Sequence, residues 1–365
     1  MKNHKTVIIT SSPQITSATT YFNELGRTFM EMGFKVVIIF DKNKIRDDDS
    51  NGLIYKTWPS KRPTKLADLL FLREVIKEEK PIYIISTFGA VNISMIGGFL
   101  FGIKNRIAWY RTTSTQLKVD SQRHWFKEKI LKTRKSLLLN LFATEIHTNS
   151  EKTAEDLKEY LSIKNKHIKI IYFLLKDFTL NFNVKKEEIV SFVGRFNPSK
   201  GQEVLINAIP TILEKHPNYI FYFVGDGITR SEQIVLSKKL NVYNSCVFTG
   251  SISQKGVYEI LAKSKLHVSA SEDEAFGMVN LEAIAFNTPI LAHKVGGIPE
   301  ILDEKINGYF FDFKSSENLS YRINKVLDNE TLYLKLQEGA RSVFENKFLL
   351  NTSNLKKRVE LILKK

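Results

Sequence analysis

The chain has 365 residues and a mass of 42.0 kDa, about twice the common size of one domain, so we expect two domains with separate cores. Hydrophobic residues make up 43% and charged residues 25%, and the mean hydropathy is -0.18, values that exclude a disordered chain and a membrane-embedded bundle. The one cysteine, Cys246, cannot form an internal disulfide. No Cys/His cluster has ligand spacing either, which indicates a reducing compartment and no structural metal.

The sequence also leads us to expect no targeting signal. The apolar run after MKNHK has about five residues, too few for a signal-peptide core, and no later run approaches the roughly 20 needed to span a bilayer. We therefore expect a cytoplasmic protein. The formal net charge of +15 is uneven, because residues 1–178 hold 30 Lys and Arg against 18 Asp and Glu. An anionic partner of the first half is one explanation of this excess.

The basic residues are densest in the segment 121–142, where apolar side chains lie between the charges. Six cations stand there against one carboxylate: Arg123, Lys127, Lys129, Lys132, Arg134, Lys135 and Glu128. The pattern predicts a basic amphipathic helix, which can lie on an anionic membrane surface. A surface helix with a solvated basic face would give the same pattern. No nucleic-acid motif accompanies the charge, so we expect no nucleic acid as a partner.

Apolar runs alternate with amphipathic stretches along the first half, which indicates a mostly parallel, helix-covered sheet. We expect strands from Thr6, from Lys35, and at 83–86, 106–110 and 145–148, with helices including 64–79 and 151–161. A polar stretch without a clear period lies between about 176 and 187, and we place the hinge there.

The same alternation resumes after the hinge with EIVSFVGRF. We expect strands in YIFYFVG, VFT, LHVSA and PILA, and helices at Gln202–Lys215, 231–240, 254–263 and 278–286. From Ser316 onward the pattern predicts helices without strands. The fold class is therefore α/β, with two doubly wound domains in tandem.

Two groups of charged residues in the second half suggest chemistry. In SFVGRFNPSKG, Arg195 and Lys200 are five residues apart where a strand turns into a helix, which suits a diphosphate but also a basic helix cap. In SASEDEAFGMVNLEAI, Glu274 and Glu282 are eight residues apart, and we place the start of a helix near Gly277. Carboxylates bind vicinal hydroxyls well, although both residues could equally be solvated charges near the helix start. Together the two groups would divide a nucleotide sugar between them.

Five segments in order resemble the nucleotide-binding domain of retaining glycosyltransferases of family 4, also called glycosyl transferases group 1. They are SFVGRFNPSKG, FYFVGDGITR, VFTGSIS, SASEDEAFGMVNLEAIAFNTPI and KVGGIPEIL, and they cover about 120 residues. The resemblance implies a GT-B fold of two Rossmann-like domains facing across a cleft. It assigns residues 1–178 to the acceptor domain and 187–346 to the donor domain, with a helix at about 347–365 packing back on the first.

The resemblance also implies residue roles. Arg195 and Lys200 would bind the donor diphosphate, Glu282 the ribose hydroxyls, and Glu274 the region of the transferred sugar. Arg195, Lys200 and Glu274 would thus be the catalytic residues. The backbone of the following residues would meet sugar, phosphate or base: Gly250, Ser251, Ala275, Phe276, Gly277 and Met278.

The first domain departs from the family pattern. Its first strand is followed by SSPQITSATTYF, which lacks the usual glycine pair. Either hydroxyls such as that of Ser12 replace the backbone amides on the acceptor side, or the acceptor is held in another way. Where many relatives have a histidine, this chain has RIAWYRTTSTQL. Arg111 in that segment could hold an acceptor phosphate or the leaving group, or be a salt-bridged loop arginine.

The sequence therefore predicts a retaining glycosyltransferase. We expect the donor to be a UDP-sugar and the acceptor a lipid-linked saccharide of bacterial surface polysaccharide synthesis, with no metal or other cofactor. The basic segment 121–142 would bring the enzyme to the inner face of the cytoplasmic membrane. Two alternatives remain: a nucleotide-sugar epimerase of the same fold, and a non-catalytic nucleotide-sugar-binding or membrane scaffold protein.

Overall fold

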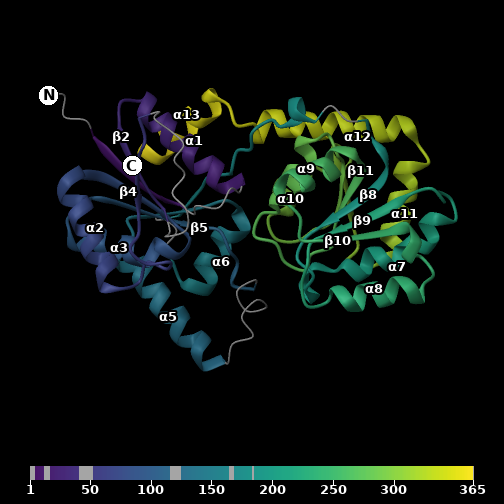
Figure 1. Cartoon of the computed structure of the whole chain (residues 1–365), viewed down its shortest axis with the longest axis horizontal. Helices are drawn as coiled ribbons and strands as arrows, with labels where there is room; N and C mark the ends of the chain where they lie inside the picture. The colour runs from purple at the N-terminus through teal and green to yellow at the C-terminus, as the bar shows by residue number, and fades with distance from the viewer. Residues whose placement is uncertain are drawn as a thin grey trace. The chain divides into compact units, whose positions relative to one another are not determined.

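The computed structural model describes residues 5–11, 17–40, 52–115, 125–163, 168–182 and 185–364. The chain forms two compact units (Figure 1). Unit 1 comprises Met1–Leu174 and Leu350–Lys365, and unit 2 comprises Leu175–Leu349. The chain thus leaves unit 1 once and later returns to it.

Unit 1 is built on a parallel sheet in which all described strand pairs run in the same direction. Its strands are β1 (Thr6–Ser11), β2 (Lys35–Phe40), β3 (Ile54–Thr57), β4 (Pro81–Thr87), β5 (Asn105–Tyr110), β6 (Glu145–Thr148) and β7 (Ile168–Ile170). The order across the sheet is β3-β2-β1-β4-β5-β6-β7. The strand order reverses between β1 and β4, the arrangement of a doubly wound sheet.

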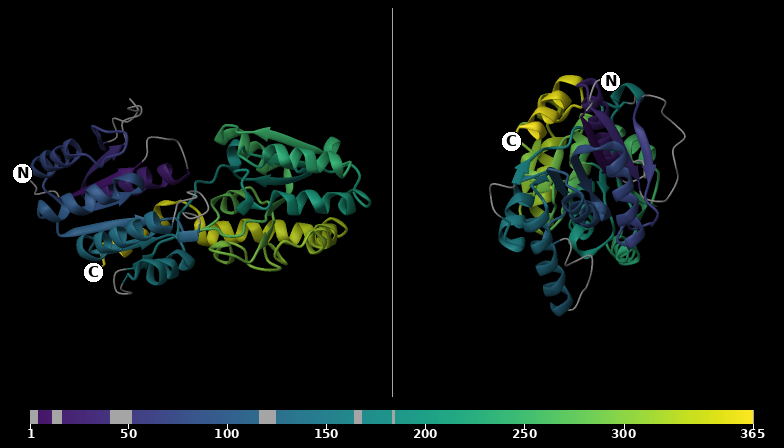
Figure 2. Two further views of the ribbon diagram at one scale, coloured as in Figure 1. Left: turned by 90° about the horizontal axis from the view of Figure 1, so that it is seen from below. Right: turned by 90° about the vertical axis from the view of Figure 1, so that its left-hand side faces the viewer.

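Helices cover the sheet of unit 1. They are α1 (Ser17–Glu31), α2 (Leu66–Glu79), α3 (Val91–Leu100), α5 (Trp125–Phe142), α6 (Glu151–Leu161) and α13 (Thr352–Leu363). Apolar side chains of α2, α3, α5 and α6 form one buried cluster with the central strands. α1 and α13 pack against each other and appear side by side in both views (Figures 1 and 2).

The last helix of the chain belongs to unit 1 through its apolar face. Leu355, Val359 and Ile362 of α13 are buried at spacings of three to four residues, which places them on one side of the helix. Asn351 begins the helix, because its side chain accepts a hydrogen bond from the Asn354 amide at 2.8 Å. Burial of three such side chains contributes about 1.5–3 kcal/mol each.

Unit 2 repeats the architecture with a second parallel sheet. Its strands are β8 (Glu187–Val193), β9 (Ile220–Val224), β10 (Cys246–Gly250), β11 (Ser264–Ser269), β12 (Ile290–His293) and β13 (Gly308–Phe311). The order is β10-β9-β8-β11-β12-β13, so the strand order reverses between β8 and β11.

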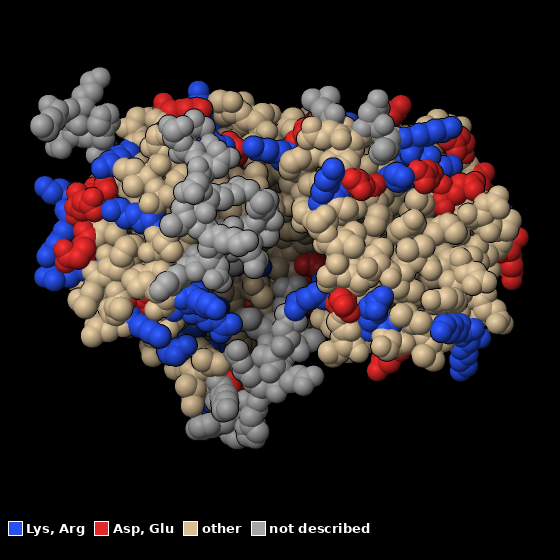
Figure 3. All heavy atoms as spheres, viewed as in Figure 1, with Lys and Arg blue, Asp and Glu red and all other residues tan. Residues whose placement is uncertain are grey.

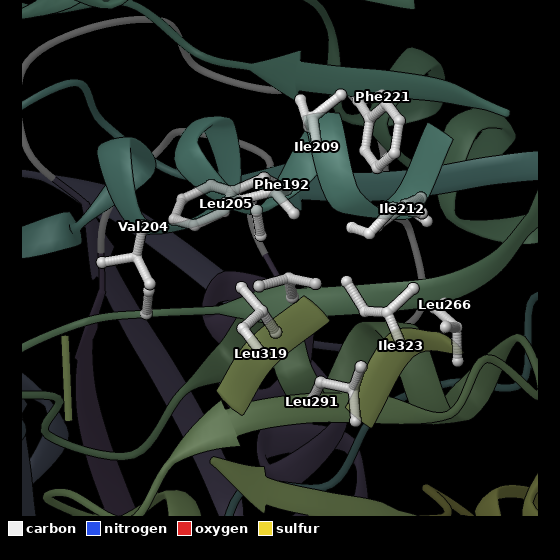
Figure 4. Packing of buried hydrophobic residues seen from close by; sticks show 14 of the residues in the cluster. Phe192, Val204, Leu205, Ile209, Ile212, Phe221, Leu266, Leu291, Leu319 and Ile323 are labelled. Carbon is white, nitrogen blue, oxygen red and sulfur yellow. The ribbon is translucent and has the colours of Figure 1, made fainter. Parts of the chain in front are cut away.

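The helices of unit 2 are α7 (Gln202–Leu213), α8 (Arg230–Lys239), α9 (Gln254–Lys263), α10 (Met278–Ala285), α11 (Ser316–Leu327) and α12 (Glu330–Val343). Short 3-10 turns lie at Thr179–Asn181, Pro198–Lys200, Tyr243–Ser245 and Ile298–Glu300, and a π-helical turn at Phe344–Phe348. The core packs α7, α11 and α12 on the sheet. Figure 4 shows the part of it formed by α7, α11 and the strands. In that view Ile209 and Ile212 of α7 lie near Phe221, and Leu319 and Ile323 of α11 approach Leu291.

The architecture confirms the expected fold class of two parallel-sheet, Rossmann-like units. The chain from Ser316 to Leu363 contains helices and no strand among its described residues, as expected. The expected elements omit β3, β7, β13 and α3. The three strands have only three or four residues, and β3 is half-buried throughout, so none shows a clear alternation. Among the described residues, no helix is both long and apolar enough to cross a membrane.

Candidate functional site

The reversal of strand order in unit 2 marks where its site lies. In open parallel sheets, ligands bind beyond the carboxyl ends of the strands, at the point where the strand order reverses. In this sheet the point lies between β8 and β11, which pair in parallel. The loop after β8 carries Arg195 and Lys200, and the loop after β11 carries Glu274. The two charged groups singled out from the sequence therefore flank the same point.

The loop after β8 requires a glycine before α7. Gly201 has φ +71°, and a Cβ atom there would lie 2.4 Å from the carbonyl oxygen of Ala270, the residue that follows β11. Any side chain at this position would push the two loops apart. The close approach brings Lys200, the last residue of the preceding 3-10 turn, to the β11 side. Arg195 is exposed, and its carbonyl oxygen accepts a hydrogen bond from Gln202 Nε2 at 2.9 Å.

Lys200 and Glu274 form an ion pair across the two loops. Lys200 Nζ lies 2.6 Å from Glu274 Oε2 and 3.4 Å from Ser271 Oγ. Both charged side chains are largely withdrawn from solvent, with 16% and 19% exposed. Screening by water is therefore weaker than for a surface pair, and removal of one partner would leave the other without full compensation.

The backbone of Glu274 is held by the glycine pair of the segment KVGGIPEIL. Gly296 has φ +58°, and a Cβ atom there would lie 1.8 Å from the Glu274 carbonyl oxygen. That oxygen accepts a hydrogen bond from the Gly297 amide at 2.9 Å. The glycine pair thus allows the β12 loop to fix the position of the Glu274 loop.

His293, the last residue of β12, fixes the neighbouring Ser271. Its Nδ1 lies 3.2 Å from the Ser271 carbonyl oxygen, and its Nε2 accepts a hydrogen bond from the Lys314 amide at 3.2 Å. Because Nε2 accepts, Nδ1 carries the proton and donates to Ser271. Burial lowers the pKa of His293, which favours this neutral ring.

The loop after β11 leads directly into α10. Ala275 and Phe276 are buried, and Phe276 contacts the ring of Phe348 with 6.0 Å between the ring centroids. Gly277 has φ +94° and precedes the first helical residue, Met278. The amides of the first turn of α10 therefore lie directly after the Glu274 loop.

Glu282 lies on α10 and is only 5% exposed. Gln254 Nε2, at the start of α9, donates to Glu282 Oε1 at 3.2 Å. This bond connects α10 with the start of α9. The residues just before α9 include Gly250, the last residue of β10, at φ +68°, and the exposed Ser251. Glu282 is therefore a buried carboxylate that accepts a hydrogen bond from Gln254, and not a solvated charge on the helix surface.

Two further residues of this region escaped the sequence analysis. Ser271 and Gln254 contact Lys200 and Glu282, respectively, through side-chain hydrogen bonds. Neither has a type or spacing that marks it, because Ser and Gln are common in turns and on helices. Only the strand order reveals that they meet the charged residues.

The acceptor-side residues belong to unit 1. Ser12 lies outside the described residues. Arg111 follows β5, and its guanidinium carbon lies 5.2 Å from the centre of the Phe173 ring. Burial lowers the pKa of Arg111 to about 10. Among the residues that the structure describes, no group of three or more His, Cys, Asp or Glu is arranged to hold a metal ion.

Comparison with known proteins shows which family unit 2 resembles. Residues 176–343 match the profile of the family Glycosyl transferases group 1. This part of the chain is similar to the glycosyltransferase domains of that family. The N-acetyl-alpha-D-glucosaminyl L-malate synthase of Bacillus anthracis is 31% identical to the chain over 162 residues, which are 44% of the chain and 42% of that enzyme. The chain spans about half the length of the curated relatives it matches.

Solved structures resemble the whole chain. A glycosyltransferase from Rickettsia africae has a TM-score of 0.76 at 20% identity and covers 99% of both chains. Anabaena Alr3699/HepE, solved in complex with UDP and glucose, also has a TM-score of 0.76, at 15% identity and with the same coverage. At these identities the likeness shows the fold, and it confirms the expected GT-B class. Residues 176–343, which match the family profile, contain all the charged residues described above in unit 2, and the match supports the expectation of a transferase.

Proposed function

We propose that the chain is a retaining glycosyltransferase that moves a sugar from a nucleotide sugar to a hydroxyl acceptor. The observation that carries the proposal is the meeting of Lys200 and Glu274 where the strand order reverses, inside the matched glycosyltransferase domain. A cation and a carboxylate side by side suit a ligand in which a phosphate adjoins sugar hydroxyls.

In the proposed complex the donor diphosphate lies between the cations and the start of α10. Lys200 exchanges its contact with Glu274 for a phosphate oxygen, and Arg195 binds the diphosphate from the same loop. The amides after Gly277 add the positive end of the α10 dipole. As the glycosidic bond breaks, negative charge grows on the departing nucleoside diphosphate, and these groups stabilise it.

The carboxylates take the hydroxyl groups. Glu274, released from Lys200, accepts hydrogen bonds from the transferred sugar, and Glu282 accepts them from the ribose. The backbone at Gly250 and Ser251 then contacts the base. The acceptor attacks from the side of the departing phosphate, which retains the configuration at the anomeric carbon. Arg195 and Lys200 supply the positive charge at the diphosphate, so the proposal includes no metal ion.

We propose a UDP-sugar as donor, and the complexes of Anabaena Alr3699/HepE with UDP support this choice. For the acceptor we propose a lipid-linked saccharide of bacterial surface polysaccharide synthesis. Its support is the charge of the first half and the exposed apolar side chains of α5: Ile130, Leu137 and Leu141 are 52%, 55% and 63% exposed. Lys and Arg gather on the lower part of unit 1, where Figure 1 places α5 (Figure 3).

Calorimetry and a transfer assay with a panel of nucleotide sugars test the proposal. We expect UDP and one UDP-sugar to bind the full chain, and the sugar to pass to a lipid-linked acceptor with the anomeric configuration unchanged. Arg195→Ala and Lys200→Ala are expected to weaken UDP binding, whereas Lys255→Ala, an exposed lysine on α9, is expected to leave it unchanged.

Three outcomes would contradict the proposal. Conversion of the nucleotide sugar to its epimer without any acceptor would show an epimerase. Donor binding without turnover on any acceptor would show a non-catalytic binding protein. An absence of nucleotide binding would remove the assigned site altogether.

A further inference from the structure

Unit 1 contains a cavity of about 440 Å³ that the donor site does not use. Its walls are the turn after β4 and the start of α3, at Gly89, Val91 and Asn92, then residues 108–112 at the end of β5, one side of α5, and the end of α6. The cavity therefore lies on the side of the sheet that α3, α5 and α6 cover. Its volume lies within the range typical of small-molecule sites.

The side of α5 that lines the cavity differs from its outer side. Leu131, Leu138 and Leu139 line the cavity together with Lys132 and Lys135. These positions recur every three to four residues, which is the spacing of one helix face. The cavity thus has an apolar wall with two lysines on the same helix. The outer side of α5 carries the exposed Ile130, Leu137 and Leu141.

Cations exceed carboxylates in the wall. Arg111, Lys132, Arg134 and Lys135 line the cavity, with Glu128 as the one carboxylate among the described lining residues. Tyr160 Oη donates to Glu128 Oε1 at 2.8 Å, so one oxygen of that carboxylate already accepts a hydrogen bond. The cavity is therefore positively charged inside an apolar surround, an arrangement that favours an anion.

Lys135 is the lining cation that most favours a bound anion. Its Nζ lies 4.0 Å from the centre of the Tyr110 ring, and among the described residues it forms no ion pair with a carboxylate. Burial lowers the pKa of Lys135 to about 8, although Asp156 on α6 opposes this shift. Asp156 is itself held by the amide and hydroxyl of Ser114. A cation that is desolvated and only partly compensated gains from a bound anion.

A hydrogen-bond donor of the lining residues adds to this observation. Tyr110 Oη is buried and has no hydrogen-bond partner in the part of the chain that the structure describes. Tyr110 lines the cavity, and Lys135 Nζ lies over its ring. Buried polar groups are normally hydrogen-bonded, so a donor without a partner in the wall is consistent with a ligand that accepts.

We propose that this cavity binds the phosphate end of a single-chain lipid, with the phosphate at Lys135 and Lys132 and the first part of the chain along the leucines of α5. The assignment of this lipid as the acceptor rests on the proposed function, whereas the binding itself does not. The exposed apolar residues on the other side of α5 would keep the site next to the bilayer that holds the rest of the chain.

Calorimetry with three probes tests the site in the full chain. The probes are decyl phosphate below its micelle-forming concentration, inorganic phosphate and decyl maltoside, which offer anion plus chain, anion alone and chain alone. We expect decyl phosphate to bind at least about tenfold more tightly than either of the others, because only it uses both parts of the cavity. Equal binding of inorganic phosphate would show an anion site without a lipid and would contradict the proposal.

Matched variants locate the binding. Lys135→Gln is expected to weaken the binding of decyl phosphate about tenfold or more, which is the loss typical of one hydrogen bond to a charged group. Lys135→Arg is expected to restore most of the affinity. Lys129→Gln serves as the control, because Lys129 is an exposed lysine of the same helix that does not line the cavity. Unchanged binding by Lys135→Gln, or an equal loss in Lys129→Gln, would overturn the assignment.

Proton uptake provides a readout that general damage to the fold would not give. At pH 8.5 part of the Lys135 population is neutral, and a bound phosphate would favour the charged form, so binding should take up protons from the buffer. We expect this uptake, measured in buffers of different ionisation enthalpy, in the unchanged protein and not in Lys135→Gln. UDP binding measured on the same samples separates the outcomes, because a failed donor site would leave decyl phosphate binding intact.

Discussion

The contact of Lys200 with Glu274 brings together two residues 74 positions apart in the chain. If Lys200 stabilises the departing diphosphate, its loss affects the transition state more than the folded protein. We expect Lys200→Ala and Arg195→Ala each to lower kcat/KM roughly thirtyfold to several thousandfold. This factor corresponds to a loss of about 2 to 5 kcal/mol of transition-state stabilisation. Steady-state transfer assays measure this, with Lys255→Ala as the control. Near-normal turnover in either variant would remove the role of that residue.

Gly296 allows a second prediction at this scale. Gly296→Ala would place a Cβ atom 1.8 Å from the Glu274 carbonyl oxygen, so the loop must move. A displacement of about 1 Å at a reacting group can cost about a hundredfold in rate, and we expect a loss of that order.

Gly33→Ala is the matched control for Gly296→Ala. Gly33 also has a positive φ, +86°, but an added Cβ would meet nothing within 4 Å. This substitution should cost about 1 to 2 kcal/mol of folding free energy with transfer activity retained. Equal activity of the two variants in the transfer assay would show that the glycine pair does not position Glu274.

The charged residues of the site were predictable as residue types but not as neighbours. The spacing of Arg195 and Lys200 at a strand-to-helix turn indicates an anion site, and the resemblance to a family adds the expected partners. The pairing of β8 with β11 then decides that Lys200 meets Glu274. That pairing follows a long crossover, and local periodicity carries no information about it.

At the scale of elements, the sequence is most informative where apolar periodicity is long. The helices 151–161 and 254–263 are confirmed within a residue, and each has a serine cap, Ser150 and Ser253, whose side chain accepts an amide hydrogen bond. The four-residue strands β3 and β13 were not predicted, because strands this short take their structure from the sheet beside them.

The ion pair of Asp177 with Arg341 joins the segment before β8 to α12. Burial alone would raise the pKa of Asp177, but hydrogen bonds from Arg341 and Thr179 outweigh this and lower the pKa to about 2. A carboxyl whose pKa is lower in the folded state stabilises the fold above its unfolded pKa of about 3.9. That stabilisation is lost as the pH falls through about 2.

We therefore expect Asp177→Asn to cost about 1 to 2 kcal/mol in urea unfolding at pH 7, less than the full pKa shift implies because the pair is partly exposed. The difference from the unchanged protein should shrink between pH 4 and pH 2. Asp328→Asn is the control, since Asp328 is 44% exposed in its contacts with Lys215 and His216. A cost that is constant with pH would contradict the assigned role of the Asp177 charge.

At the scale of the whole molecule, α13 is the element that returns to unit 1. Val359 is fully buried, so Val359→Asp places a charge in an apolar environment and should destabilise unit 1 by about 2 to 4 kcal/mol. Hydrogen exchange resolved by peptide measures this directly. We expect faster exchange in β1 and β2 and unchanged exchange in β8 and β9. Lys357 is an exposed position on the same helix, so Lys357→Asp should change hydrogen exchange in neither unit. Equally faster exchange in both units of Val359→Asp would contradict the division of the chain into two units.

The return of α13 has a consequence for the order of events on the ribosome. Synthesis of residues 175–349 supplies every strand of the second sheet before the final helix has been made. Until that helix emerges, the apolar side of α1 that receives it stays open to solvent. The domain that is begun first is therefore the one completed last, and a nascent chain paused before residue 350 would present an exposed hydrophobic strip for chaperones to bind.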